Sequence, residues 1–116
     1  MKKGKSMNKY FFTLLTLLSF QAYGSSWDGT VTGEIRKLDV VVNDGNNAGF
    51  RIELVNNPAL CGNEQTWAYI NKSDENYQVA VSVLLAAKMA KNPVSLYTKK
   101  NTSWNDYCHV GYVVLR

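Results

Sequence analysis

The sequence has 116 residues, of which 46% are hydrophobic and 12% aromatic, and it carries a formal net charge of +4. This length and composition fit one compact domain and exclude a disordered tail, a collagen-like repeat and a multidomain enzyme. A positive charge spread over the domain would favour a nucleic-acid or anionic-membrane partner, so its position along the chain decides what it means.

The positive charge is concentrated in an N-terminal segment that has the layout of a secretory signal peptide. Four lysines, at positions 2, 3, 5 and 9, precede an apolar run over residues 10–20. Ala22-Tyr23-Gly24 then supplies the small residues that cleavage after Gly24 requires. The apolar run is well short of the roughly 20 residues that span a bilayer, which favours a cleaved signal over a membrane anchor. We therefore expect residues 1–24 to be a signal peptide and residues 25–116 to be one secreted or periplasmic domain.

Loss of the signal peptide removes the charge excess. Taking 24 residues from 116 leaves 92, and taking four lysines from the 13 basic residues leaves nine, which balance the nine acidic residues. A domain without net charge has no electrostatic footprint for a phosphate backbone. We therefore expect no nucleic-acid partner and no membrane insertion.

Two cysteines, Cys61 and Cys108, are present, and both lie in the expected mature domain. An even cysteine count in an exported domain favours a disulfide over a thiol nucleophile or a metal site. A bridge between residues 47 apart stabilises a fold by about 4 kcal/mol on the chain-entropy model. That contribution matters because a domain of this size buries a small core.

The first half of the mature chain predicts three strands. Residues 30–42 are rich in β-formers without helical periodicity, and Gly33 suggests a bulge or kink in a long, bent strand. The Asn-, Asp- and Gly-rich residues 43–49 predict a turn. Residues 50–55 alternate apolar and charged side chains, as in a half-buried antiparallel strand. A loop with Cys61 follows, and residues 65–71 predict the third strand.

One helix is expected next. Ser73 or Asp74 can cap its first turn, and Asp74 and Glu75 place negative charge where the helix dipole favours it. Asn92-Pro93 ends the helix, because proline disfavours helical geometry at the preceding residue. The stripe expected to pack on the sheet consists of Tyr77, Val81, Leu84, Leu85 and Lys88.

Two strands close the sequence, over residues 94–99 and 107–115, separated by a polar loop that carries Trp104. One face of the last strand is expected to carry the side chains of Cys108, Val110, Tyr112 and Val114. Three strands, one helix and two strands are the order of an OB-fold, a mainly β, five-stranded antiparallel Greek-key barrel with its α-helix between strands 3 and 4. A β-grasp-like fold or an open α+β roll is the structural alternative.

Catalytic and metal-binding signatures are missing from the sequence. His109 is the single histidine, and no Cys/His ligand spacing occurs, so we expect no metal and no cofactor. The adjacent carboxylates Asp74 and Glu75 are explained by helix capping rather than by acid–base chemistry. No set of nucleophile, base and orienting group is recognisable, and no glycine-rich phosphate loop occurs. We therefore expect a protein that is not an enzyme.

Aromatic and amide side chains are the remaining chemical signal. Three tryptophans and seven tyrosines accompany many Asn, Ser and Thr residues. Aromatic rings pack on the apolar faces of sugars while amides and hydroxyls bind sugar hydroxyls, which would suit a glycan site. The alternative is structural: Trp67 and Tyr69 lie in the core, while Trp27 and Trp104 pack at the barrel ends or at a subunit interface.

Three segments resemble one toxin family. They are Trp27 with Asp28-Gly29-Thr30-Val31-Thr32-Gly33, then Leu84-Leu85-Ala86-Ala87 running into Pro93-Val94-Ser95-Leu96-Tyr97, and last Val110-Gly111-Tyr112-Val113. These segments are similar to the B-subunits of subtilase cytotoxin. That family consists of exported OB-fold domains that assemble as pentamers and bind sialylated glycans.

The resemblance implies a ligand site. In the family, the Asp and the Ser of the first segment contact sialic acid, and the matching residues here are Asp28 and Thr32. Thr32 keeps the hydroxyl that would bind the carboxylate of the sugar, and Tyr97 is the aromatic residue that joins them. Thr98 stands where the family has a second tyrosine, and the pair of Cys61 and Cys108 departs from the cysteine arrangement of the family.

The leading hypothesis is a secreted or periplasmic, non-enzymatic domain similar to an AB5-toxin B-subunit. It would bind a host-cell glycan as a homo-oligomer, a pentameric ring that pairs the strand edges a lone barrel exposes. A toxin A-subunit would be its partner. The alternative hypothesis is a monomeric periplasmic OB-fold protein with a binding or stress-response role, or a protein inhibitor, without a sugar ligand.

Overall fold

The computed structural model describes residues 26–43 and 47–116, so the expected signal peptide lies outside the described residues. Within them the elements in chain order are β1 (Gly29–Gly33), β2 (Ile35–Val40), β3 (Phe50–Leu54), β4 (Ala68–Ile70), α2 (Tyr77–Ala90), β5 (Val94–Asn101) and β6 (Tyr107–Leu115). None of the helices in this part of the chain combines the length and the apolar character that a membrane crossing requires.

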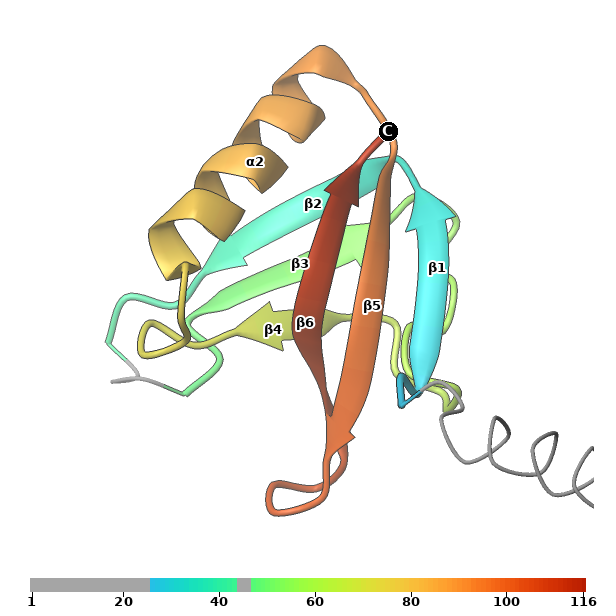
Figure 1. Cartoon of the computed structure of the whole chain (residues 1–116), viewed down its shortest axis with the longest axis vertical. Coiled ribbons are helices and arrows are strands. Elements are labelled where there is room, and N and C mark those ends of the chain that lie inside the picture. The colour runs from blue at the N-terminus through green and yellow to red at the C-terminus, as the bar shows by residue number, and fades with distance from the viewer. Residues whose placement is uncertain (1–25, 44–46) are drawn as a thin grey trace, which may run out of the picture.

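The strands form one six-stranded mixed sheet in the order β1-β5-β6-β4-β3-β2 (Figure 1). β1 and β2 are separated in sequence by Glu34 alone, yet they lie at opposite edges of the sheet. The sheet therefore curls into a half-barrel, with α2 inserted in the chain between β4 and β5. The prediction of a mainly β domain with one helix in this position is confirmed.

The break after Gly33 corrects the expected number of strands. The predicted strand over residues 30–42 does bend at this glycine, but it divides into two strands with different partners. β1 pairs with β5, and β2 pairs with β3. The structure therefore has six strands where the sequence predicted five.

One strand pair also corrects the expectation of an antiparallel sheet. β4 and β6 run parallel and meet where Tyr69 lies opposite His109. The other four pairs are antiparallel. β4 itself has three residues, far fewer than the predicted strand over 65–71, because Gln65–Trp67 belongs to the loop that follows Cys61.

The helix begins later than predicted. α2 starts at Tyr77 after Asn76, which has a left-handed backbone and no capping side-chain hydrogen bond. Asp74 is not the cap, because its Oδ2 accepts hydrogen bonds from the backbone N–H of Asn71 and lies 2.6 Å from Nε2 of His109. Neither Asp74 nor Glu75 lies in the first turn, so the expected dipole contribution is wrong.

The end of α2 follows the prediction closely. Lys91 takes the left-handed conformation, and its N–H reaches the carbonyls of Ala87 and Lys88. Asn92 N–H also bonds to the carbonyl of Ala87, 2.9 Å away. This geometry satisfies the last carbonyls of the helix before Pro93 turns the chain into β5.

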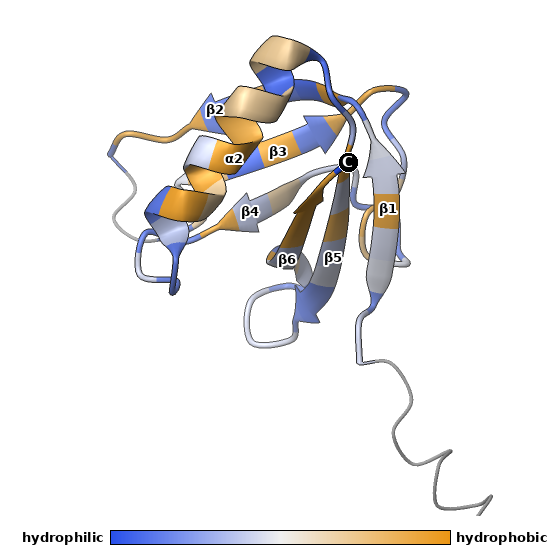
Figure 2. Ribbon diagram, turned by 45° about the horizontal axis from the view of Figure 1, so that its top comes forward, coloured by the Kyte–Doolittle hydropathy of each residue, from blue (hydrophilic) through white to orange (hydrophobic). Residues whose placement is uncertain are grey.

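The packing of α2 differs from the predicted stripe. Leu84 and Ala87 are buried, and Tyr77 and Val81 pack beside them. Leu85 and Lys88 lie on the exposed side instead, because the side of the helix that carries Leu84 and Ala87 faces the sheet. In Figure 2 much of the α2 ribbon is orange to tan, the colours of hydrophobic residues, with bluer segments between them.

The core lies between the curled sheet and α2, and the predicted disulfide closes it. Cys61 and Cys108 are bonded, with their Cα atoms 5.7 Å apart, and both are fully buried. The buried side chains of Thr98 and Leu96 from β5 lie in this core. The remaining large core residues are Ile35, Phe50, Ile52, Leu54, Leu60, Tyr69, Ile70, Leu84, Val94 and Val110.

A bulge at Gly111 changes which face of β6 points into the core. Tyr97 lies opposite Tyr112, whereas the next residue, Thr98, lies opposite Val110, so Gly111 has no partner position on β5. Val110 is buried, but Tyr112 is 55% exposed. The prediction that Cys108, Val110, Tyr112 and Val114 share one face is therefore wrong beyond Gly111.

Candidate functional site

The expected ligand residues lie on the outer side of the β1–β5–β6 segment. Antiparallel pairing puts Thr30 opposite Tyr97 and Thr32 opposite Ser95. Because side chains on directly opposed positions share a face, both threonines point to the same side as Tyr97. We call this surface the β1–β5 face, defined by Asp28, Thr30, Thr32, Ser95, Tyr97, Tyr112 and Arg116.

A polar chain occupies one end of the β1–β5 face. Thr32 Oγ1 lies 2.5 Å from Ser95 Oγ, and Ser95 Oγ accepts a hydrogen bond of 2.9 Å from Arg116 Nε. The backbone N–H of Arg116 bonds to the carbonyl of Pro93, which fixes the arginine beside β5. The terminal nitrogens of Arg116 make no hydrogen bond to the described residues, so they are available to an anion.

Aromatic rings cover the middle of the face. The Tyr97 ring lies 5.0 Å from Tyr112 and 5.9 Å from Trp27, measured between centroids, and Trp27 stacks on Tyr112 at 6.5 Å. Gly111 makes room for this cluster, because a side-chain carbon there would collide with the Trp27 ring. The cluster therefore depends on the bulge in β6.

Asp28 lies at the opposite end of the face. Its Oδ2 accepts a hydrogen bond of 2.8 Å from the backbone N–H of Lys100, and its own N–H bonds to the carbonyl of Thr98. A strand rises about 3.3 Å per residue, so Asp28 and Thr32 are separated by about 13 Å along β1. The structure brings Asp28, Thr32 and Tyr97 onto one face but not to one point.

Ser95, Tyr112 and Arg116 belong to this surface and were missed by the sequence analysis. Ser95 lies in the predicted strand over residues 94–99, but nothing in the sequence gives the register that places it against Thr32. Arg116 carries no motif and reaches Ser95 across 21 positions. The signal that could have found Tyr112 is Gly111, since a glycine inside a strand often marks a bulge.

A second cluster of polar and aromatic groups surrounds His109. Its ring stacks on Tyr69 at 4.7 Å, and its Nε2 is bonded to Asp74. Burial raises the pKa of the Tyr69 phenol, and the charge of Asp74 also raises it. The hydrogen bond that Asn101 donates to the phenol oxygen lowers this pKa by less than burial raises it. These contacts hold the loop before α2 against β6, which is a structural role.

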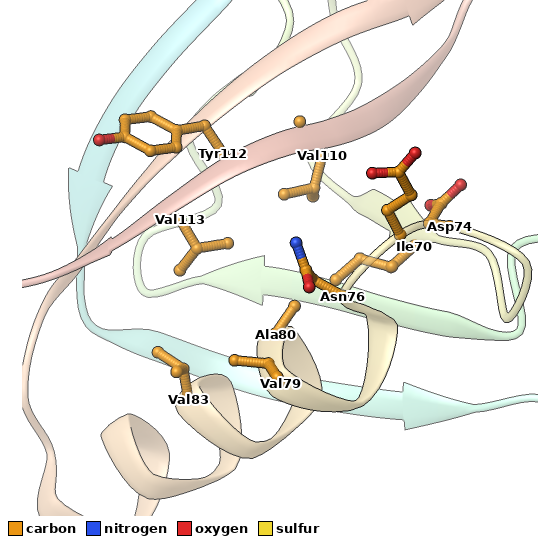
Figure 3. A pocket seen from close by; sticks show the side chains of 11 residues that line it. Ile70, Asp74, Asn76, Val79, Ala80, Val83, Val110, Tyr112 and Val113 are labelled. Atoms are coloured by element: carbon orange, nitrogen blue, oxygen red, sulfur yellow. The ribbon is translucent and has the colours of Figure 1, made fainter.

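A cavity of about 290 Å³ lies between α2 and β6 (Figure 3). Val79 and Val83 of α2 face Val110 and Val113 of β6 across it, and Asp74 lies near one end. Its lining includes none of the three predicted ligand residues. In the described ranges, no group of three or more His, Cys, Asp or Glu side chains could hold a metal ion.

Comparisons with known proteins give no relative: no family model matches the chain, and no curated protein and no solved structure matches it either.

Proposed function

We propose that the mature chain is a secreted or periplasmic, non-enzymatic OB-fold domain that binds sialylated or related host-cell glycans, similar to the B-subunit of an AB5 toxin. The single observation that carries this proposal is the chain of Thr32, Ser95 and Arg116 beside the Tyr97 cluster. It combines an exposed guanidinium, the exposed side chain of Thr32 and aromatic rings on one face, and the buried hydroxyl of Ser95 links Thr32 to Arg116 beneath that face.

The strand order supports the OB-fold. If β1 and β2 are counted as the two halves of one bent strand, the sheet contains five strands. One half of the first strand then pairs with β5 and the other half pairs with β3. The helix then lies between the third and fourth of them. These are the features of a five-stranded, partly open Greek-key barrel.

The chemistry of the β1–β5 face suits an acidic sugar. A guanidinium binds a carboxylate through two parallel hydrogen bonds, and the terminal nitrogens of Arg116 are available for this. The hydroxyl of Thr32 can add a third hydrogen bond to the same carboxylate. The exposed ring of Tyr112 offers a surface for the apolar side of a pyranose.

The exposed side of α2 supports assembly into a ring. Val79 is 63% exposed, Leu85 47% and Met89 85%, on a helix whose one charged residue is Lys88. A helix that is hydrophobic around most of its circumference is usually buried. Copies of the chain packed through α2 would cover this surface, and a ring would let weak glycan sites act together.

The first test is the solution mass of residues 25–116 by light scattering, followed by titration with 3′-sialyllactose. A pentamer that binds the sugar supports the proposal. Thr32→Ala should weaken binding about tenfold, the expected cost of one hydrogen bond to a charged group, without lowering stability appreciably. Thr102→Ala, in the β5–β6 turn, is the matched control. A monomer leaves the OB-fold standing but rejects the ring, and unchanged binding removes Thr32 from the site.

A further inference from the structure

We propose a second saccharide site, distinct from the β1–β5 face, in a groove beside Trp67 that selects uncharged or amino sugars over acidic ones. The groove is shallow and open to solvent, with a volume of about 470 Å³, and lies between the loop that follows Cys61 and the β5–β6 turn. We call it the Trp67 groove; its lining includes Asn63, Glu64, Gln65, Trp67, Asn105 and Asp106.

The amide groups of the groove are held in place by the backbone. Gln65 Oε1 accepts a hydrogen bond from the N–H of Cys108, at 3.3 Å, and Asn63 Oδ1 accepts one from the N–H of Gln65, at 3.0 Å. With both oxygens used, the NH2 groups remain as donors. The disulfide from Cys61 to Cys108 ties this loop to β6, so the donors sit on a constrained frame.

Trp67 supplies an aromatic platform that cannot turn freely. The Arg51 guanidinium lies 4.8 Å from its ring centroid, and the Tyr107 ring lies 5.2 Å away at a tilt of 43°. Tyr69 lies on a third side at 6.4 Å. The tryptophan stays partly exposed where it lines the groove. An ordered ring beside planar amides is an arrangement that recognises a pyranose.

The carboxylates of the groove make no ion pair with the described residues, although Asp106, like Asn105, has a left-handed backbone that Asp and Asn tolerate in turns. Glu64 and Asp106 are both exposed. The β5–β6 turn is held by its backbone, since Asp106 N–H bonds to the carbonyl of Asn101 and Tyr107 N–H to that of Trp104. The side chains of Glu64, Asn105 and Asp106 therefore remain free to bind a ligand.

The net charge around the groove favours one kind of sugar: Glu64 and Asp106 line it, and the Arg51 guanidinium over the Trp67 ring offsets one of these two negative charges. Carboxylates accept hydrogen bonds from sugar hydroxyls or from an ammonium group, but they repel the carboxylate of a sialic acid. The Thr32 end of the β1–β5 face has the opposite character, because Arg116 is the charged group there and the carboxylate of Asp28 lies at the other end. The Trp67 groove would thus bind a neutral or amino hexose that the face does not select.

The experiment is a ¹H–¹⁵N NMR titration of the mature, disulfide-bonded chain with methyl β-D-galactopyranoside, methyl β-D-glucopyranoside, D-glucosamine and N-acetylneuraminic acid. We expect a neutral or amino sugar to shift the signals of residues 63–67 and 105–106, including the Trp67 indole. N-acetylneuraminic acid should leave these signals unchanged. No shifts with any neutral or amino sugar, or equal shifts with the acidic one, would overturn the proposal.

Substitutions separate binding from folding. Glu64→Gln and Asp106→Asn should each weaken the sugar affinity about tenfold, because each loses a charged hydrogen-bond acceptor. Glu75→Gln, an exposed carboxylate before α2, is the matched control and should change nothing. Trp67→Ala disturbs Arg51 and Tyr107 as well, so Trp67→Phe is the informative ring variant. Unchanged affinity in both carboxylate variants would place the sugar elsewhere.

The two sites can fail separately. Thr32→Ala should leave the shifts at residues 63–67 intact, and Glu64→Gln should leave binding of 3′-sialyllactose intact. The Trp67 groove therefore does not depend on the proposed function of the β1–β5 face.

Discussion

The β1–β5 face and the Trp67 groove are both aromatic surfaces, but they are built and charged differently. The face rests on regular strand pairing, in which register alone places Thr32 opposite Ser95. The groove rests on two loops, one of which is tied to β6 by the disulfide. Arg116 marks the face, whereas Glu64 and Asp106 mark the groove. On the two proposals, the neighbouring charge and not the aromatic content would decide which sugar each surface accepts.

Removal of the disulfide is the strongest way to break this comparison. The double substitution Cys61→Ser with Cys108→Ser should lower the free energy of unfolding by about 4 kcal/mol, since the bridge joins residues 47 apart. Urea unfolding of the oxidised chain gives the reference value. The loop before Trp67 should loosen first, because its tie to β6 is lost, while β1 keeps its pairing with β5.

Hydrogen exchange distinguishes the two surfaces in that variant. Amides of residues 61–67 should exchange faster relative to those of β1 and β5. Reduced wild-type protein, which keeps both sulfur atoms, is the control for the serine substitutions. Equal acceleration in both regions would show that the groove is not built separately from the face.

A substitution at Gly111 tests the face. Gly111→Ala places a carbon against the Trp27 ring, which must move away from Tyr112. Overpacking of this kind costs about 1–3 kcal/mol. Thermal unfolding should show the loss, near-ultraviolet circular dichroism should report the disturbed rings, and binding of 3′-sialyllactose should weaken while the Trp67 signals stay in place.

Gly49→Ala is the matched control for this substitution, because the nearest atom to an added carbon there, the carbonyl oxygen of Val41, lies at ordinary contact distance of 3.6 Å. It should leave both the rings and the stability nearly unchanged. A Gly111→Ala protein as stable as the Gly49→Ala protein would mean that the Trp27 ring is not held by β6.

Local signals in the sequence predicted those elements whose limits are set locally. Tyr107–Leu115 is a strand with the predicted bounds, and α2 ends before Asn92-Pro93 as expected. The start of α2 was missed because the capping candidate Asp74 bonds to His109, 35 residues away. No local propensity reports such a contact.

The candidate site was predictable to the same extent. Asp28, Thr32 and Tyr97 were indicated by the resemblance to the toxin family and not by periodicity, and the structure places Thr32 and Tyr97 on one face of β1 and β5 with Asp28 just before β1. The partner of Thr32 depends on strand register, and the position of Arg116 depends on the path of the chain after Gly111. The Trp67 groove depends on a disulfide that joins two loops, so neither its depth nor its amide orientation follows from spacing.

The carboxyl group of Glu53, which lies outside both surfaces, gives a smaller effect on stability that depends on pH. Glu53 on β3 accepts a hydrogen bond from Arg36 and lies 3.4 Å from Lys37 Nζ. The hydrogen bond from Arg36 is the main cause that lowers the pKa of Glu53 from its ordinary value of 4.5, and the charges of Arg36 and Lys37 lower it further. Burial of the carboxyl group acts in the opposite direction. The contribution to stability is therefore present above about pH 4.5 and is lost as the pH falls through the lowered folded-state pKa.

Glu53→Gln should cost about 0.5 kcal/mol at neutral pH, as for a partly exposed ion pair, and should flatten the acid end of the stability curve measured by urea unfolding. A variant that loses stability in acid as steeply as the wild type would assign the acid sensitivity to other carboxyl groups. Because Glu53 lines neither surface, sugar binding at neutral pH should be unchanged in this variant. Sugar binding at the Trp67 groove can also be measured at acidic pH in Glu53→Gln, while the chain remains folded. If binding is still lost in acid, the loss originates in the groove itself and not in the stability of the sheet.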